Sequence, residues 1–272
     1  MRTTVETLFG VFRSGRQIAV LLVSAAIYAG LSVALPDLEI VEGYPGLRPA
    51  VALIVALAIV GGAPAVWAAA LGGLVIGLMG AGPLGRGIVG GLGEALAGFV
   101  TALTAWKTGW LLRARFADYD PDVRPGLWDV LWDCFLVGLA SASVYTVFLA
   151  WLGEVTHVAS FAYVAAVIGP NALVAILVLT YPLLMVLMPI ARRADVVWRD
   201  PRGDAARVGT ARVGRGLIWL GTMVAAAIGF ALYAPEATSL VNLADPDIVQ
   251  GVLVWVVQVP FILVMWIGAL LG

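Results

Sequence analysis

The sequence has very few residues of the kinds that build disulfides, metal centres and nucleic-acid interfaces. Of its 272 residues, one is cysteine, Cys134, and one is histidine, His157. A single cysteine excludes an internal disulfide and a cysteine-based zinc site, and a single histidine excludes a histidine cluster. The net charge of −1 gives no overall attraction to nucleic acid. We therefore predict no metal, no cofactor and no nucleic-acid partner.

Sequence motifs of catalysis are also missing. The chain has no histidine–acid motif for a catalytic metal, no phosphate-binding glycine loop with a lysine, and no serine elbow. Many Gly-x-x-x-Gly spacings are present, but in an apolar sequence they indicate helix packing. We therefore expect that the protein is not an enzyme.

Charged residues are scarce as well. They make up 12% of the chain and apolar residues 62%, whereas soluble domains average about 25% charged and 45–50% apolar. The mean hydropathy is +1.00. One aqueous core cannot hide this much apolar surface, so lipid must cover the rest. The composition predicts an all-α, polytopic transmembrane helical bundle in a lipid bilayer.

Eight apolar segments have about the length needed to cross a hydrocarbon core of about 30 Å. The first could instead be a cleaved signal, although its 19 residues favour a retained helix. Between the second and third, Gly61 to Pro64 is a tight breaker without a polar loop. The eight predicted spans are residues 17–35, 46–62, 64–81, 88–106, 127–152, 168–190, 216–234 and 249–271.

These spans divide the chain into three parts. Residues 1–193 form a six-span membrane domain, residues 194–214 a basic cytoplasmic loop, and residues 215–272 a two-span C-terminal hairpin. The stretch 158–190 is too long for one straight crossing and contains Gly169-Pro170-Asn171. It predicts either an external flap over 158–168 before the sixth span or one long, kinked helix.

The placement of basic residues gives the orientation. With a cytoplasmic N-terminus and eight crossings, fourteen of the sixteen basic residues lie on the cytoplasmic side. Only Arg48 and Arg86 lie outside. The positive-inside rule predicts this asymmetry. We therefore expect a multi-pass protein of the plasma membrane with both termini in the cytoplasm.

Glu94 is the most informative single residue, because it lies inside the fourth span. An ionisable group in lipid costs several kcal/mol unless it is paired or hydrated, so it marks a candidate functional site. Arg86 lies eight residues earlier and can share its helix face. The alternative is a structural carboxylate that pairs with Arg86 or Arg48. Both interpretations remain open from the sequence.

Small residues recur along the first span. Such stripes let helices approach closely in lipid, either within one chain or against a partner subunit. Replacing Gly30 by leucine should therefore disturb assembly. The residues of this stripe are Ala25, Ala26, Ala29 and Gly30.

The order of motifs in the first six spans resembles the substrate-capture (S) components of energy-coupling factor transporters. The segment 46–53 (GLRPAVAL) leads into a short apolar run and is followed by 61–67 (GGAPAVW). The segments 87–92 (GIVGGL) and 170–171 (PN) with 181–184 (YPLL) come later. The chain differs from this family in lacking polar residues after the hairpin and in having two extra C-terminal helices.

The resemblance implies a six-helix S-component-like block and a function in uptake. Such a protein captures a small solute, such as a vitamin or a related micronutrient. A membrane coupling subunit and cytoplasmic ATPases then drive its release inward. The small residues of the first span would meet the coupling subunit. Binding residues would come from the external loops and later helices, and the residues expected here are Arg48, Glu94, Asn171, His157 and Tyr163.

Two other classes of function remain open at this stage. A membrane sensor or scaffold could use the basic loop and the two-helix tail to contact other proteins. A lipid-modifying membrane enzyme is the weakest alternative, because such enzymes usually carry acid or histidine clusters for metal.

The topology can be tested by labelling single cysteines introduced into residues 191–214 and 236–247. The basic asymmetry places the first segment in the cytoplasm and the second outside. An impermeant thiol reagent added to intact cells should therefore label only the second segment. Labelling of 191–214 from outside would contradict the eight-span topology.

Overall fold

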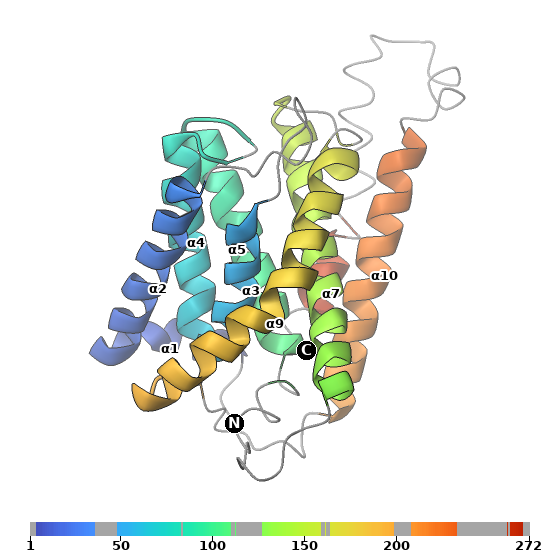
Figure 1. The fold of residues 1–272 in the computed structure, drawn as a ribbon. Coiled ribbons are helices and arrows are strands. Elements are labelled where there is room, and N and C mark those ends of the chain that lie inside the picture. The colour runs from blue at the N-terminus through green and yellow to red at the C-terminus, as the bar shows by residue number, and fades with distance from the viewer. Residues whose placement is uncertain are drawn as a thin grey trace, which may run out of the picture.

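The fold is a bundle of helices (Figure 1), seen in a computed structural model that describes residues 4–35, 48–82, 84–109, 112, 127–158, 161, 164–198, 208–232, 260 and 262–268. All secondary structure within these residues is helical. The elements are α1 Thr4–Gly10, η1 Val11–Arg13, α2 Gly15–Ala34, α3 Pro49–Gly61, α4 Ala63–Met79, α5 Ile88–Thr108, α7 Leu127–Val155, the π-helix η2 Val164–Ile168, α9 Gly169–Arg193 and α10 Val208–Leu232.

Four of the described helices, α2, α5, α7 and α9, are long and apolar enough to cross a membrane. This is consistent with a membrane protein. Two further apolar helices, α3 and α4, are shorter, and α10 contains the apolar stretch Gly216–Ile228. With 13 residues, α3 extends only about 20 Å at 1.5 Å per residue. The predicted span 249–271 lies mostly outside the described residues, so eight crossings remain a prediction.

Consecutive helices run in opposite directions (Figure 1). The end of one long helix and the start of the next therefore lie at the same end of the bundle. The start of α2 and the ends of α5 and α9 lie together, and the side chain of Arg16 reaches Asp195 just beyond α9. Lys107 at the end of α5 donates to Thr4 Oγ1 at 3.0 Å. We call this the basic end, because it carries the basic residues Arg13, Arg16, Lys107, Arg192 and Arg193.

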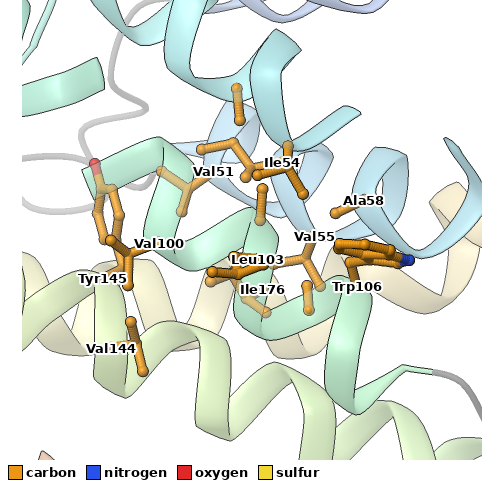
Figure 2. Close-up of a cluster of buried hydrophobic side chains, with 14 of the residues drawn as sticks. Val51, Ile54, Val55, Ala58, Val100, Leu103, Trp106, Val144, Tyr145 and Ile176 are labelled. Atoms are coloured by element: carbon orange, nitrogen blue, oxygen red, sulfur yellow. The ribbon is translucent and has the colours of Figure 1, made fainter. Parts of the chain in front are cut away.

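The short helix α3 lies at the centre of the bundle. Eleven of its thirteen residues are buried, because α2, α4, α5 and α9 pack around it. Figure 2 shows Val51, Ile54 and Val55 of α3 beside Val100 and Leu103 of α5. A helix that is apolar on all sides is suited to this position. Such a helix needs no lipid contact, which explains why its length does not match the bilayer.

Glycine lets α4 and α5 pack with their backbones in contact. A Cβ atom at Gly73 would lie 2.4 Å from the carbonyl oxygen of Glu94, and one at Gly77 would lie 2.3 Å from that of Gly90. Gly98 approaches the carbonyl oxygen of Ala69 in the same way. The contact residues recur every fourth position on both helices, which is the small-residue packing expected in lipid.

The tight turn predicted between residues 61 and 64 is confirmed. Gly62 joins α3 to α4 with φ 61° and ψ −137°, a conformation that favours glycine. A Cβ atom there would lie 2.3 Å from the ring of Trp198. The backbone N–H of Trp198 donates to the carbonyl oxygen of Val60 at 2.9 Å. The segment after α9 therefore folds back under α3 and closes the basic end.

The sequence left two interpretations of residues 158–190 open, and the described residues favour the continuous helix. The π-helix η2 leads directly into α9, with Pro170 in the first turn of α9. The second half of the predicted flap is therefore helical. Helix α10 begins at Val208, inside the segment 194–214 that the sequence predicts to be a basic cytoplasmic loop.

The C-terminal part packs on the remainder of the bundle. Gly268 contacts the backbone of Gly214 and Ile218 in α10, and Thr222 Oγ1 donates to Met265 Sδ at 3.4 Å. The ring of Trp266 stacks on Phe99 of α5, with centroids 6.3 Å apart. The C-terminal part therefore extends the packing of α5 and α7.

The small residues of the first span point in different directions. Ala25 is buried, with its carbonyl oxygen 3.2 Å from where a Cβ of Gly72 would lie. Ala29 is half-buried, whereas Ala26 and Gly30 are exposed. No atom lies within 4 Å of a Cβ built on Gly30. Close packing inside this chain thus explains Ala25 and not Gly30, whose role in partner contact remains a prediction.

Replacing Gly77 by alanine should lower the free energy of unfolding by about 1–3 kcal/mol, because the new methyl group forces α4 away from Gly90. Gly30→Ala is the matched control. It adds the same methyl group to open space inside α2, so its thermal stability should equal or exceed that of the wild type. Thermal unfolding in detergent measures both. Equal stability of the two variants would contradict backbone contact between α4 and α5.

Candidate solute site

A small polar cavity lies near the end of the bundle opposite the basic end. Helices α2, α3, α4, α5 and α7 contribute to its wall. Its volume is about 20 Å³, which is room for about one water molecule. The residues that line it are Tyr28, Ser32, Leu35, Arg48, Ala50, Val51, Ile76, Ala81, Glu94 and Tyr145.

Glu94 reaches this cavity from the seventh position of α5. Its side chain is only 1% exposed. The carboxylate lies against Gly82, where a Cβ atom would approach Glu94 Oε1 to 2.7 Å. The backbone of Glu94 is held at the same time by Gly73 of α4. Gly73 therefore allows the backbone of Glu94 to approach α4, and Gly82 leaves room for the carboxylate of Glu94.

Tyr28 enters the cavity from α2 in a similar way. Its ring lies over Gly72 of α4, where a Cβ atom would approach Cδ1 of the ring to 2.5 Å. One turn later, Ser32 Oγ donates to the carbonyl oxygen of Tyr28 at 2.8 Å. The contact between α2 and α4 thus places a buried phenol beside Glu94.

Arg48 and Tyr145 complete the polar wall. Arg48 directly precedes α3, whose first residue is Pro49, and does not cap that helix with its side chain. Its side chain instead lines the cavity together with Tyr145 of α7. Figure 2 shows the Tyr145 side chain beside Val100 of α5.

The cavity therefore brings opposite charges and two phenols together. The charges of Arg48 and Glu94 both act on Tyr28 and on Tyr145. A charge at this depth is tolerated when an opposite charge or water accompanies it. Guanidinium, carboxylate and phenol groups can together hold an ionic solute or an ordered water by charge-assisted hydrogen bonds.

The five solute-binding residues predicted from the sequence are placed differently. Arg48 and Glu94 line one cavity. Asn171 is the third residue of α9 and His157 is exposed after α7, and neither lines the cavity. Tyr163 lies outside the described residues. The described residues of the predicted flap do not cover the cavity either.

Arg86, the alternative partner of Glu94, lies apart from the cavity. Its side chain is exposed, and its Cβ atom lies over Gly80 at the end of α4. The shared cavity therefore associates Glu94 with Arg48 rather than with the arginine on its own helix face.

Sequence reasoning missed Tyr28, Ser32 and Tyr145. A signal was available for each. Ser24, Tyr28 and Ser32 are spaced by four along an otherwise apolar span, which places them on one helix face. Tyr145 lies in the polar stretch 141–146 in the middle of an apolar helix. Polar residues at such positions indicate a bundle interior rather than lipid.

A double-mutant cycle tests the association of the two charges. Arg48→Gln and Glu94→Gln should each lower thermal stability, while the double variant should lose less than their sum, because each single change leaves a charge behind. We expect a coupling free energy of about 1–3 kcal/mol from denaturation. The matched cycle of Arg86→Gln with Glu94→Gln should be additive. Equal coupling to Arg86 would contradict the assignment.

Three comparisons place this chain near no known protein. No protein-family model matches it, and neither the curated proteins nor the solved structures contain a match.

Proposed function

We propose that this chain is the solute-binding membrane subunit of an importer that resembles an energy-coupling factor transporter. The cavity formed by Arg48, Glu94, Tyr28 and Tyr145 is then its binding site. The observation that carries the proposal is the presence of a guanidinium, a carboxylate and two phenols around one cavity inside an apolar bundle. Convergent polar groups with apolar surroundings are the features of a small-molecule site.

The position of the cavity supports uptake from one side. It lies at the end away from Arg13, Arg16, Lys107, Arg192 and Arg193. Basic residues favour the cytoplasmic side, so the cavity faces the exterior in this proposal. The termini are then cytoplasmic and the membrane is the plasma membrane.

The chemistry of the wall indicates the class of solute. Arg48 suits an anionic group, and Glu94 suits a cationic or hydrogen-bond-donating group. A small polar solute with both kinds of group, such as a micronutrient, fits this pair. The cavity has the volume of about one water molecule, so the wall must move when a larger solute enters.

The energy for release comes from other subunits in this proposal. The sequence has no phosphate-binding glycine loop with a lysine, so a membrane coupling subunit and cytoplasmic ATPases would supply ATP hydrolysis. The exposed residues Ala26 and Gly30 of α2 form a surface on which a partner helix can approach closely.

The small volume of the cavity favours a second candidate function, a membrane sensor or scaffold without transport. In that case Arg48 and Glu94 hold α3 and α5 together and bind no solute. The two functions differ in what removal of the Glu94 charge does to bound small molecules.

Native mass spectrometry of the purified full chain tests the proposal. The wild type should retain a small molecule from the cell, and Glu94→Gln and Tyr145→Phe should lower its occupancy at least about tenfold, because each change removes a polar contact worth more than about 1.4 kcal/mol.

Ser141→Ala is the control for this experiment. It removes a buried hydroxyl from the same helix as Tyr145 but outside the cavity, so occupancy should not change. Unchanged occupancy in Glu94→Gln together with a lower melting temperature would identify the glutamate as a helix clamp and exclude the site.

A further inference from the structure

A second, larger hollow lies at the basic end and opens on the side of the bundle. Helices α2 and α9 form its two walls, and Leu57 of α3 lies in its floor. Its volume is about 380 Å³ and its lining is almost wholly apolar. Ala19, Val23, Ile27 and Ile190 on its walls are exposed. We call this hollow the α2–α9 groove.

The length of the α2–α9 groove matches one leaflet of a bilayer. Its lining residues on α2 run from Arg16 to Ile27, which is about 16 Å at 1.5 Å per residue. Half of a hydrocarbon core of about 30 Å is about 15 Å. The groove therefore extends from the interface at the basic end to about the middle of the bilayer.

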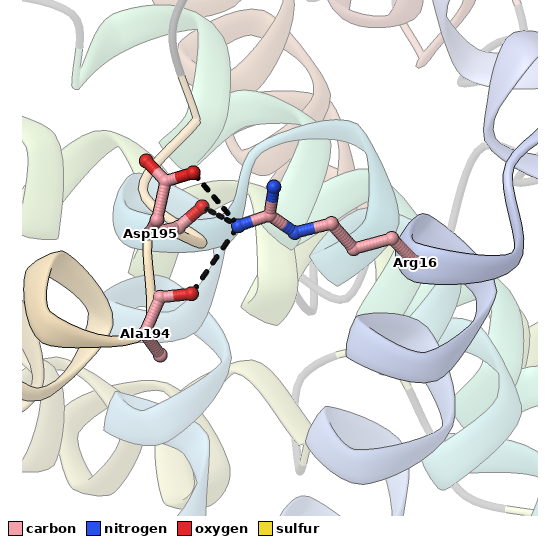
Figure 3. Close-up of polar contacts among 3 residues, drawn as sticks. All are labelled: Arg16, Ala194 and Asp195. Carbon is pink, nitrogen blue, oxygen red and sulfur yellow. Dashed lines mark hydrogen bonds and ion pairs between the residues drawn. The ribbon is translucent and has the colours of Figure 1, made fainter.

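The guanidinium group of Arg16 lies at the end of this groove that is nearest the membrane interface. Arg16 crosses from α2 to the end of α9, where Nη2 donates to Asp195 Oδ2 at 3.0 Å and to the carbonyl oxygen of Ala194 at 3.2 Å (Figure 3). It also donates to the carbonyl oxygen of Asp195. The Arg16 side chain is 57% exposed. Within the described part of the chain, these bonds use only one of its three guanidinium nitrogens, so donors remain for an anion.

We propose that the α2–α9 groove binds one phospholipid of the leaflet at the basic end, with an acyl chain along Val23 and Ile27 and an anionic headgroup on Arg16. The apolar lining suits the chain, and the cation suits the phosphate. Arg192 and Arg193 in the last turn of α9, next to the lining residues Ile190 and Ala191, add attraction for a negative headgroup.

The volume argues for an acyl chain rather than for a partner helix. A helix about 10 Å across and about 16 Å long occupies about 1,200 Å³. The groove offers about a third of that volume. A lipid tail fills a narrow groove of this kind without separating α2 from α9.

Native mass spectrometry in detergent with added phosphatidylglycerol or phosphatidylcholine tests this proposal. The wild-type chain should bind one phosphatidylglycerol at least about fivefold more tightly than phosphatidylcholine. Arg16→Gln should remove that preference. Ala19→Phe, which fills the groove with an aromatic ring, should weaken binding of both lipids at least about fivefold.

Three control variants separate the lipid site from other effects. Arg13→Gln removes an exposed charge that does not line the groove, and Ala26→Phe adds the same ring to α2 outside it, so both should bind like the wild type. Asp195→Asn breaks the ion pair but leaves the Arg16 charge, so phosphatidylglycerol binding should persist or strengthen.

Each outcome decides for or against the proposal, provided that helicity and size-exclusion profiles match the wild type. Equal binding of the two lipids overturns the headgroup contact. Unchanged binding in Ala19→Phe overturns the groove. If Arg16→Gln and Asp195→Asn lose phosphatidylglycerol binding equally, the role of Arg16 is to hold α2 on α9 and the proposal is wrong. If the groove binds a helix of a partner protein and no lipid, the proposal is also wrong.

Discussion

The burial of a carboxyl group inside an apolar bundle is the constraint on which the surrounding structure depends. Glu94 is 1% exposed, at a depth where an isolated charge is costly, and it shares one cavity with the half-buried Arg48. The helices around them must therefore approach closely enough to exclude lipid. Gly72, Gly73 and Gly82 allow that approach, because a methyl group at any of them would collide with a residue of the site. The close packing of the helices and the placement of the polar side chains in the cavity therefore depend on the same glycines.

The short helix α3 gives this arrangement its geometry. Because its 13 residues extend only about 20 Å, α3 is short, and Arg48, directly before its first residue, is half-buried and lines the cavity. The apolar sides of α3 pack on α2, α4, α5 and α9, and the segment after α9 closes its other end through Trp198. A longer α3 would carry the arginine away from Glu94.

Helix α2 takes part in both proposed sites. Its buried side carries Tyr28 and Ser32 at the polar cavity, and its start carries Arg16 at the α2–α9 groove. Since α2 packs mainly on α4 and meets the end of α9 through Arg16, a bound lipid would act on the same helix that forms a wall of the solute site. The two sites lie at opposite ends of the bundle.

Much of this protein follows from its sequence alone. The all-helical fold, the candidate spans that correspond to α2, α5, α7 and α9, the turn at Gly62 and the position of Glu94 inside the bundle were predictable, because hydropathy, glycine–proline breakers and a charge among apolar residues are local signals. The tertiary structure decided that Glu94 shares a cavity with Arg48 rather than Arg86, that Tyr28 and Tyr145 join them, and that Asn171 and His157 do not. It also decided that Gly30 faces outward while Ala25 is buried. Those outcomes depend on how far each helix is rotated about its axis and on which helices are neighbours. In an apolar span with small residues on several faces, the sequence leaves that rotation open, and only the packing of all the helices together determines it.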